Sequence, residues 1–328
     1  MVSRQLLFKE WKQMDLTFIL VMIVGIFATP LSVLMDYSSF QTCLKDVTCE
    51  TASSQFSLDF HTDTFISVSW SIGLLFAMMQ LGMERNKGQL DFTLSLPFSR
   101  ATIYNTKFFL GAGIIAVIHI ASFTVTYFVL LGIRPSHTLG FKNEYMAALI
   151  ACLMVYSLFL AAGALTGGSV AQAIVAMTTA ILPFLMIGLP LANLDIVFKF
   201  RDYIETYALE NMLSVLSPLM YLTNENPLLH DSVLLTHEQF IIPCIMFILF
   251  YLIGLLGFLN HPVERNGRFF LYSKLDRPIQ IIVIILGVLG FGWIGYSSNS
   301  SMFGYLIGMI IGGIIGILIS YFLIYRKR

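Results

Sequence analysis

The sequence predicts an all-α integral membrane protein, a polytopic helical bundle of about eight transmembrane helices with an N-terminal amphipathic interfacial helix. Three observations predict this fold class. Hydrophobic residues make up 57% of the 328 residues and charged residues only 12%, whereas soluble domains carry about 25% charged residues. About eight apolar stretches reach the roughly 20 residues that a helix needs to cross a bilayer. Those stretches contain no charged side chain.

The spans are placed on the apolar runs between polar or charged connections. Lipid offers the backbone no hydrogen-bond partners, so each run is expected to be helical. The predicted spans are Thr17–Met35, Thr64–Gly82, Phe108–Ile133, Tyr145–Leu165, Val170–Ala192, Phe240–Leu259, Ile281–Tyr296 and Met302–Tyr325.

Basic residues divide unevenly between the two sets of connections that alternate along the chain. The set that includes both termini holds 14 of the 19 Lys and Arg residues, and the other set holds 5; the acidic residues divide 6 against 13. The positive-inside rule therefore predicts a multi-pass protein of the cell membrane with both termini in the cytoplasm. The formal net charge is zero, so the charge does not indicate nucleic acid as a partner, and the apolar spans indicate membrane lipid.

Residues 1–16 are predicted to form a cytoplasmic amphipathic helix. Leu7, Trp11 and Met14 recur at helical spacing, which favours a helix at the inner interface with the indole at headgroup level. A frayed polar leader is the alternative. The apolar run that follows exceeds the h-region of a signal peptide, so the first span is expected to be retained as an anchor.

The connection at residues 83–107 is the most specific stretch of the chain. Leu90 and Leu94 stand four residues apart, so a short helix there would carry one apolar stripe. Pro97 disfavours helical backbone at the preceding residue, and Ser99 can cap the helix that becomes the third span. A short cytoplasmic helix held between two spans could transmit motion; an ordinary solvated loop is the alternative.

The outer connections hold one long segment and a cysteine pair. Residues 193–239 form the longest connection, and their middle part, Tyr203–Leu222, is predicted to lie on or dip into the outer interface. Cys43 and Cys49 share the first outer loop, where an oxidising exterior would allow a disulfide; two free thiols are the alternative. Cys152 and Cys244 are expected to be small apolar residues within helices.

Glycines recur every four residues along the last span. The overlapping G-x-x-x-G units make a groove that lets another helix backbone approach. We predict packing against the preceding span, and a pore or substrate groove is the alternative. The glycines are Gly304, Gly308, Gly312 and Gly316.

The sequence lacks the common catalytic motifs. It has no G-x-x-x-x-G-K-[ST] loop for ATP and no G-x-S-x-G elbow, and His237-Glu238 lacks the second histidine of a zinc-protease motif. We therefore predict no catalytic, cofactor-binding or metal-binding residue and no enzyme activity in this chain. Movement of a substrate powered by an ATPase on another chain remains.

Residues 83–107 resemble the first cytoplasmic loop of ABC-2-type transporter permeases, which in that family is the coupling helix seated in a cleft of the nucleotide-binding subunit. The N-terminal helix resembles the family's elbow helix. The length and eight-span layout resemble the permeases of the Gram-positive transporter linked to acetoin utilisation. The residues that match the loop pattern are Glu84, Gly88, Leu90, Leu94, Leu96, Pro97, Ser99, Arg100 and Lys107.

The resemblance implies three parts: an elbow helix at 1–16, a six-helix permease core at 17–259, and an additional two-helix unit at 260–328. It also implies an ATPase subunit that binds the ATP and a second permease subunit, identical or related. Glu84 and Arg100 are expected to make polar contacts to the ATPase. The leucines at 90, 94 and 96 are expected to form its apolar contact.

The cargo that this reading implies is a small or amphiphilic compound such as acetoin. One alternative function is a non-transporting sensor or scaffold that couples an outer ligand site to a cytoplasmic ATPase or kinase. A second is an intramembrane lipid-modifying enzyme, which would need a polar cavity around His119, the only imidazole within a predicted span.

Overall fold

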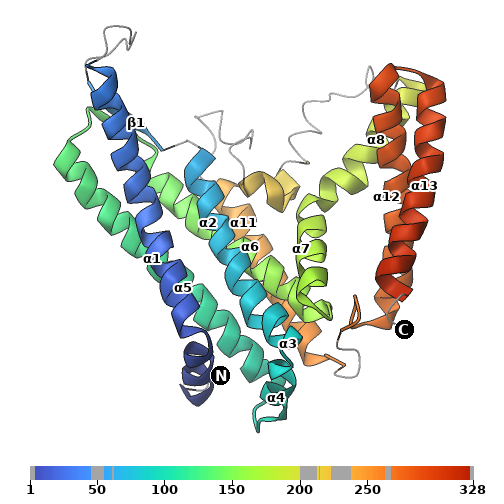
Figure 1. Cartoon of the computed structure of the whole chain (residues 1–328), viewed down its shortest axis with the longest axis horizontal. Helices are drawn as coiled ribbons and strands as arrows, with labels where there is room; N and C mark the ends of the chain where they lie inside the picture. The colour runs from blue at the N-terminus through green and yellow to red at the C-terminus, as the bar shows by residue number, and fades with distance from the viewer. Residues whose placement is uncertain are drawn as a thin grey trace.

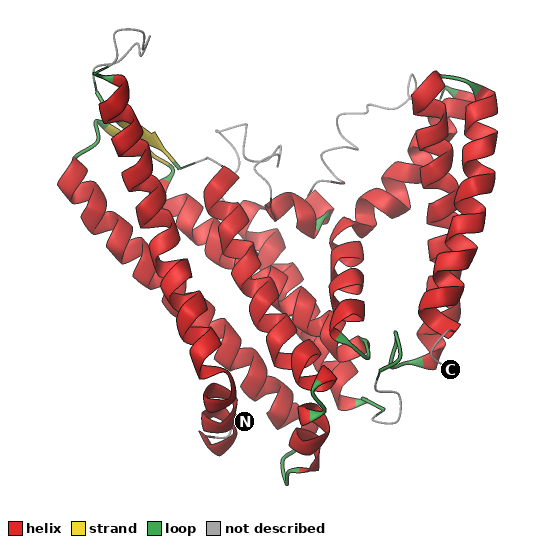
Figure 2. Cartoon of the chain, in the orientation of Figure 1, coloured by secondary structure: helices red, strands yellow, loops and turns green. Residues whose placement is uncertain are grey.

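The computed structural model describes residues 4–45, 55–60, 63–199, 213, 215–222, 238–262 and 267–325. Helices make up nearly all of the regular structure in these residues (Figure 2). In chain order the elements are α1 (Arg4–Cys43), β1 (Ser57–Asp59), α2 (Asp63–Ala77), the π-helix η1 (Met78–Met83), α3 (Glu84–Asn86), α4 (Gln89–Ser95), α5 (Arg100–Ile133), β2 (His137–Leu139), α6 (Phe141–Leu165), α7 (Ser169–Pro183), the π-helix η2 (Phe184–Gly188), α8 (Leu189–Phe198), the 3-10 helix η4 (Pro218–Leu222), α11 (Glu238–Leu259), α12 (Ser273–Asn299) and α13 (Met302–Tyr325).

Seven helical runs among the described residues are long and apolar enough to cross a membrane. The remaining predicted span, Thr64–Gly82, is an α-helix of 15 residues, α2, that continues directly into the 6 residues of η1. The prediction of an all-α polytopic bundle is confirmed. Both ends of the chain lie at the same end of the bundle (Figure 1), as an even number of crossings requires.

The N-terminal arm and the first predicted span form one helix. α1 is 40 residues long and does not break before Thr17. Leu6 and Glu10 in the arm are buried, and the ring of Trp11 lies 5.9 Å from that of Phe18. The arm is therefore packed against the bundle, which places its charged residues close to other helices.

α6 is the central helix of the bundle. It contacts α2, α5, α7 and α11, and nearly all of its residues between Ala151 and Ala164 are buried. Small residues let neighbouring helices approach closely where packing holds helices together in lipid. Aromatic rings fill the space between α5 and α11, with Phe108 and Tyr251 centred 4.5 Å apart. This core holds in place the helix ends that the 83–107 connection joins, which we call the inner ends of α2 and α5.

The predicted span Val170–Ala192 belongs to a longer apolar run, Ser169–Phe198, that bends on the way. α7 ends at Pro183, η2 follows, and α8 continues towards α12 (Figure 1). Proline and π-turns are established causes of helix bends. The bend carries α8 away from α6 and into contact with α12.

On the side opposite the chain ends, two short strands join two connections whose pairing was not predicted from the sequence (Figure 1). β1 and β2 pair in parallel, with Ser57 opposite His137, so the α1–α2 connection is tied to the α5–α6 connection. Next to the strands, the rings of Phe60 and Phe141 are centred 5.0 Å apart. Strands of three residues carry too few positions for an alternating pattern to predict them.

The cysteines divide into two kinds. Cys43, at the end of α1, is disulfide-bonded. Cys49, its predicted partner, lies outside the described residues. Cys152 and Cys244 are free and lie within helices.

Only parts of the predicted outer segment, residues 193–239, are described. Its later part includes η4, which contacts α2, α6, α7 and α11. Beside η4, Ser217 is buried and the Tyr221 hydroxyl donates a hydrogen bond to the Val215 carbonyl at 3.0 Å. This part therefore covers one end of the bundle core. Most of the predicted interfacial stretch Tyr203–Leu222 lies outside the described residues.

α12 and α13 form a close hairpin in which the repeated glycines of α13 face α12. A Cβ added to any of the four would come within 3.0 Å of an α12 backbone atom. Gly287 and Gly295 on α12 make the matching contacts from the other side. The two backbones thus pack directly on each other at Gly304, Gly308, Gly312 and Gly316.

Two links attach this hairpin to the rest of the chain. On α8, the Asn193 amide donates to the Leu289 carbonyl of α12 at 3.1 Å. Near the chain ends, the Gly167 amide donates to the Phe269 carbonyl at 3.2 Å, and the Gly267 amide donates to the Gly167 carbonyl at 2.9 Å. The α6–α7 connection is therefore bound to the segment that precedes α12.

The glycine contacts predict a position-specific effect. Gly312→Ala places a methyl group against the Gly287 carbonyl, so we expect a loss of stability of about 1–3 kcal/mol and a lower thermal midpoint of the purified protein. Gly313→Ala is the matched control, because its added carbon would meet nothing closer than 3.4 Å. Equal midpoints for the two variants would contradict the packing.

Candidate functional site

The connection between α2 and α5 folds as two helical pieces joined at a glycine. α3 continues η1, and Gly88, with φ of 70°, turns the chain into α4. Glycine is favoured at a positive φ because it has no Cβ to crowd the backbone. α4 ends in an extended residue before Pro97, and the Ser99 hydroxyl accepts a hydrogen bond from the Thr102 amide at the start of α5. The helix boundaries predicted from Pro97 and Ser99 are confirmed.

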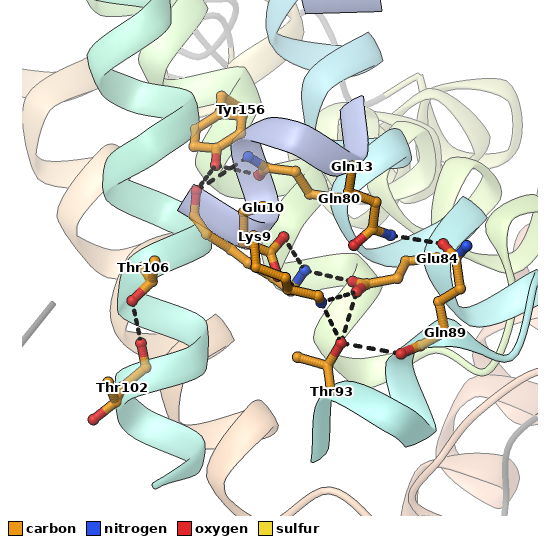
Figure 3. Close-up of polar contacts among 11 residues, drawn as sticks. Lys9, Glu10, Gln13, Gln80, Glu84, Gln89, Thr93, Thr102, Thr106 and Tyr156 are labelled. Atoms are coloured by element: carbon orange, nitrogen blue, oxygen red, sulfur yellow. Dashed lines mark hydrogen bonds and ion pairs between the residues drawn. The ribbon is translucent and has the colours of Figure 1, made fainter. Parts of the chain in front are cut away.

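Four charged side chains meet where the inner ends of α1, α3 and α5 converge (Figure 3). The Lys107 ammonium, which is 0% exposed, lies 2.5 Å from the Glu10 carboxylate and also contacts the Glu84 carboxylate. Lys9 adds a second ammonium, 3.1 Å from Glu10 and 3.3 Å from Glu84. Two cations and two anions leave this charge cluster with no net charge, as burial of ions requires.

Hydrogen bonds attach α4 to the charge cluster. The Lys9 ammonium donates to the Thr93 hydroxyl oxygen at 2.6 Å, and that hydroxyl donates to the Glu84 carboxylate at 3.0 Å. The Gln13 amide donates to the side-chain oxygen of Gln89, at the start of α4, at 2.6 Å. The arm of α1, α3, α4 and the inner end of α5 are thus one hydrogen-bonded unit.

Glu84 is committed to this interior network. Burial raises the pKa of its carboxyl, but the charge and hydrogen bond of Lys107, followed by the charge of Lys9, outweigh burial and hold the pKa below its usual value. The carboxylate is buried and bound by three internal donors. The carboxylate of Glu84 is thus occupied by contacts within its own chain, and its direct contact with a partner stays a prediction.

Arg85 of α3 connects the 83–107 connection to the C-terminal end of α6. Its guanidinium donates to the Gly163 carbonyl at 2.8 Å and to the Thr166 carbonyl, and it lies 3.1 Å from the imidazole Nε2 of His261. Burial lowers the pKa of Arg85 to about 10, so it stays charged at neutral pH. A cation at the C-terminus of a helix is stabilised by the carbonyl dipoles there.

Arg100 binds carbonyl groups at the C-terminal end of α11 in the same way. Its guanidinium donates to the Leu259 carbonyl at 3.1 Å and to the His261 carbonyl at 2.7 Å. Arg100 was predicted to contact a partner, but these bonds direct its guanidinium towards its own protein. The two arginines therefore join the connection between the second and third spans to the ends of α6 and α11.

The leucines of α4 also face inwards. Leu90 is 0% exposed, and Leu94 and Leu96 are partly buried against the main core. Leu90 thus packs against its own protein, and its apolar contact with a partner stays a prediction. Residues four apart share one face of a helix, and Phe92 lies about 200° around the axis from Leu90. Phe92 is accordingly 65% exposed and is the apolar side chain that α4 presents outwards.

The sequence reading missed the role of three charged residues. Lys107 stood out only as part of the family pattern, and nothing in the spacing of the arm singled out Lys9 and Glu10. A usable signal was present, because Glu84 and Lys107 carry opposite charges close to the ends of two consecutive predicted spans. Such charges can pair across helices when the ends converge.

The described residues offer little for chemistry. His119 is buried, and its Nδ1 lies 2.9 Å from the carbonyl oxygen of Ile115 in its own helix. Among the described residues, no group of three or more His, Cys, Asp or Glu could hold a metal ion. The contacts of the element at 83–107 join it to α1, α5, α6 and α11.

Comparisons with known proteins agree with this geometry. A family model described as "ABC-2 family transporter protein" matches residues 9–263. The probable ABC transporter permease YtrC of Bacillus subtilis is 41% identical over 100% of this chain and 99% of its own length. The probable ABC transporter permease YtrD of the same organism is 40% identical over 98% of this chain and 97% of its own length. No solved structure matches the chain.

The charge cluster predicts an asymmetry between two lysines. Lys107→Met leaves the carboxylates at 10 and 84 short of a cation, so we expect a loss of about 3–5 kcal/mol. Lys87→Met, at an exposed position of the same connection, should change stability by less than about 0.5 kcal/mol. Thermal midpoints in detergent measure both. Adding Glu84→Gln to Lys107→Met should recover part of the loss, and no recovery would contradict the ionic link.

His261 predicts a pH dependence. Burial, followed by the charges of Arg85 and Arg100, lowers its pKa to about 4, against about 6.5 in an unfolded chain. Between these values the unfolded chain binds a proton that the folded chain does not, so stability falls as the pH falls. The thermal midpoint should drop between about pH 7 and about pH 5, and it should drop less in His261→Gln. An equal drop in both proteins would refute this assignment.

Proposed function

This chain belongs to the ABC-2 family of transporter permeases, and from that membership we propose that a separate ATPase subunit docks on α4 and drives the chain through its charge cluster. The chain is a membrane permease subunit of an ABC transporter. In the proposed arrangement, the ATP is bound and hydrolysed by the partner, and α4 and both termini face the cytoplasm.

The docking surface we propose is the outward face of α4. Phe92 is exposed there, and Lys87, Asp91 and Ser95 are exposed around it. α4 lies at the same end of the bundle as the two chain ends and projects from it (Figure 1). An exposed aromatic side chain rimmed by polar groups is typical of the energetically dominant residues of an interface.

The charge cluster is the observation that carries the proposal, because it makes α4 part of a larger rigid unit. Thr93 links α4 to α3 through Glu84, and it links α4 to α1 through Lys9. Lys107 links α5 to the carboxylates of Glu84 and Glu10, so displacement of α4 would displace all three helices. α1 and α5 are continuous helices of 40 and 34 residues. A small movement at the cytoplasmic end would therefore tilt two whole spans.

We also propose that the working unit contains two permease chains, identical or related. Bacillus subtilis has two permeases that resemble this chain to nearly the same extent, so related chains of this kind occur together in one cell. The cargo we propose is a small or amphiphilic compound, of which acetoin is one candidate. The uncharged spans support this choice over a charged solute.

Docking on α4 predicts that Phe92→Ala weakens the complex with the ATPase. Loss of a dominant interface residue costs about 2 kcal/mol or more, which is about 30-fold in affinity. The measurement is titration of the ATPase subunit, identified by co-purification from the native membrane, onto the permease in lipid nanodiscs.

Phe8→Ala is the matched control, because Phe8 is also 65% exposed and lies in the arm of α1. It should bind the ATPase as the unaltered chain does. Unchanged binding of Phe92→Ala would rule out docking on this face. A transporter should also raise the ATP turnover of its partner, and a complex without that rise would favour the sensor or scaffold function.

A further inference from the structure

The π-helix η1 lies directly between the second span and the coupling element. α2 passes into Met78–Met83, which passes into α3 and α4. α1 and α5 cross the level of the charge cluster as unbroken α-helices, whereas the α-helix of the second span is interrupted. Single π-turns inside α-helices are frequent at functional positions.

Gln172 of α7 fastens the beginning of η1 to α6 and α7. Its amide donates to the Ala77 carbonyl, just before η1, at 3.1 Å and to the Phe159 carbonyl of α6 at 2.8 Å. The side chain fits because Gly82 and Gly163 lack a Cβ. A Cβ on Gly163 would lie 2.6 Å from the Gln172 amide nitrogen, and one on Gly82 would overlap the amide oxygen.

Gln80, inside η1, fastens the π-helix to α5 and to α6. Its amide donates to the Lys107 carbonyl of α5 at 3.1 Å, and its oxygen accepts a hydrogen bond from the Tyr156 hydroxyl at 2.6 Å (Figure 3). Lys107 is the same residue whose ammonium joins the charge cluster. η1 is therefore held by two glutamine anchors, one from α7 that also binds α6 and one from η1 itself that binds α5 and α6.

We propose that η1 is the hinge at which the unit of α3, α4 and the charge cluster moves relative to α2, and that Gln172 holds it in the present register. The inference rests on the proposed docking of an ATPase at α4. A π-turn holds an extra residue, so moving it one position rotates the intervening residues by about 100° and shifts them by about 1.5 Å.

The present register leaves one polar atom unsatisfied. The amide oxygen of Gln172 is buried without a hydrogen-bond partner in the described part of the chain. A buried unpaired acceptor is unfavourable, and it is retained here beside a π-turn whose backbone amides change partners when the turn moves. A second register in which this oxygen is paired gives the hinge two states of similar free energy, as a switch requires.

Three variants test the hinge in the complete permease–ATPase complex. Gln172→Met keeps the side-chain volume and removes both donors, Gln80→Met cuts the other anchor, and Gly82→Ala fills the space that Gln172 occupies. Gly113→Ala is the control, because a Cβ at this α5 glycine would meet nothing within 4 Å.

The readouts are ATPase binding and the ATP-dependent change in distance between spin labels on Phe8→Cys and Phe198→Cys, both at exposed positions. We expect all four proteins to bind the ATPase as the unaltered chain does. Gly113→Ala should keep the distance change, and the three hinge variants should lose most of it.

Each other outcome overturns the hinge. If the three variants keep the distance change, η1 does not carry the movement. If they no longer insert or bind the ATPase while Gly113→Ala does, the glutamines only hold the fold together. If even the unaltered chain binds no ATPase, the proposed function fails, and the hinge fails with it.

Discussion

The buried ammonium of Lys107, held between the carboxylates of Glu10 and Glu84, is the interaction on which the end of the bundle that holds both chain ends depends. The three residues come from the N-terminal arm, the end of the second span and the start of the third. An unpaired charge in this buried position would strongly destabilise the fold. Separation of the three helix ends is therefore unfavourable. Lys9 binds both Glu84 and the Thr93 hydroxyl of α4, so α4 is attached to the same group of helix ends. A short helix thereby becomes part of a unit that includes two long spans.

The two arginines beside this unit act on helix ends. Arg85 binds the last carbonyls of α6, and Arg100 binds those of α11. Both therefore turn polar groups of the coupling element towards the protein, and α4 is left with Phe92 as its outward apolar side chain. The inward side holds the element in place, and the outward side remains for a partner. This division follows from which face of α4 carries Leu90 and Leu94.

The sequence was sufficient for the fold class, the span positions, the boundaries at Pro97 and Ser99 and the location of the connecting helix, because these depend on local composition and spacing. It did not indicate which way the leucine stripe of α4 faces, since periodicity defines a face without saying what covers it. It also did not indicate the partners of Glu84, Lys9 and Lys107, which are 75 and 23 residues away in the chain. η1 was equally unpredictable, because its anchor Gln172 lies on another helix.

The central claim is that the charge cluster moves as one body with α4. It is tested most directly by structures of the permease–ATPase complex without nucleotide and with a non-hydrolysable ATP analogue. The account predicts that Lys107 keeps both carboxylate contacts in the two structures while α4 shifts relative to α6 and α7. Separation of Lys107 from Glu10 or Glu84 in either structure would contradict it.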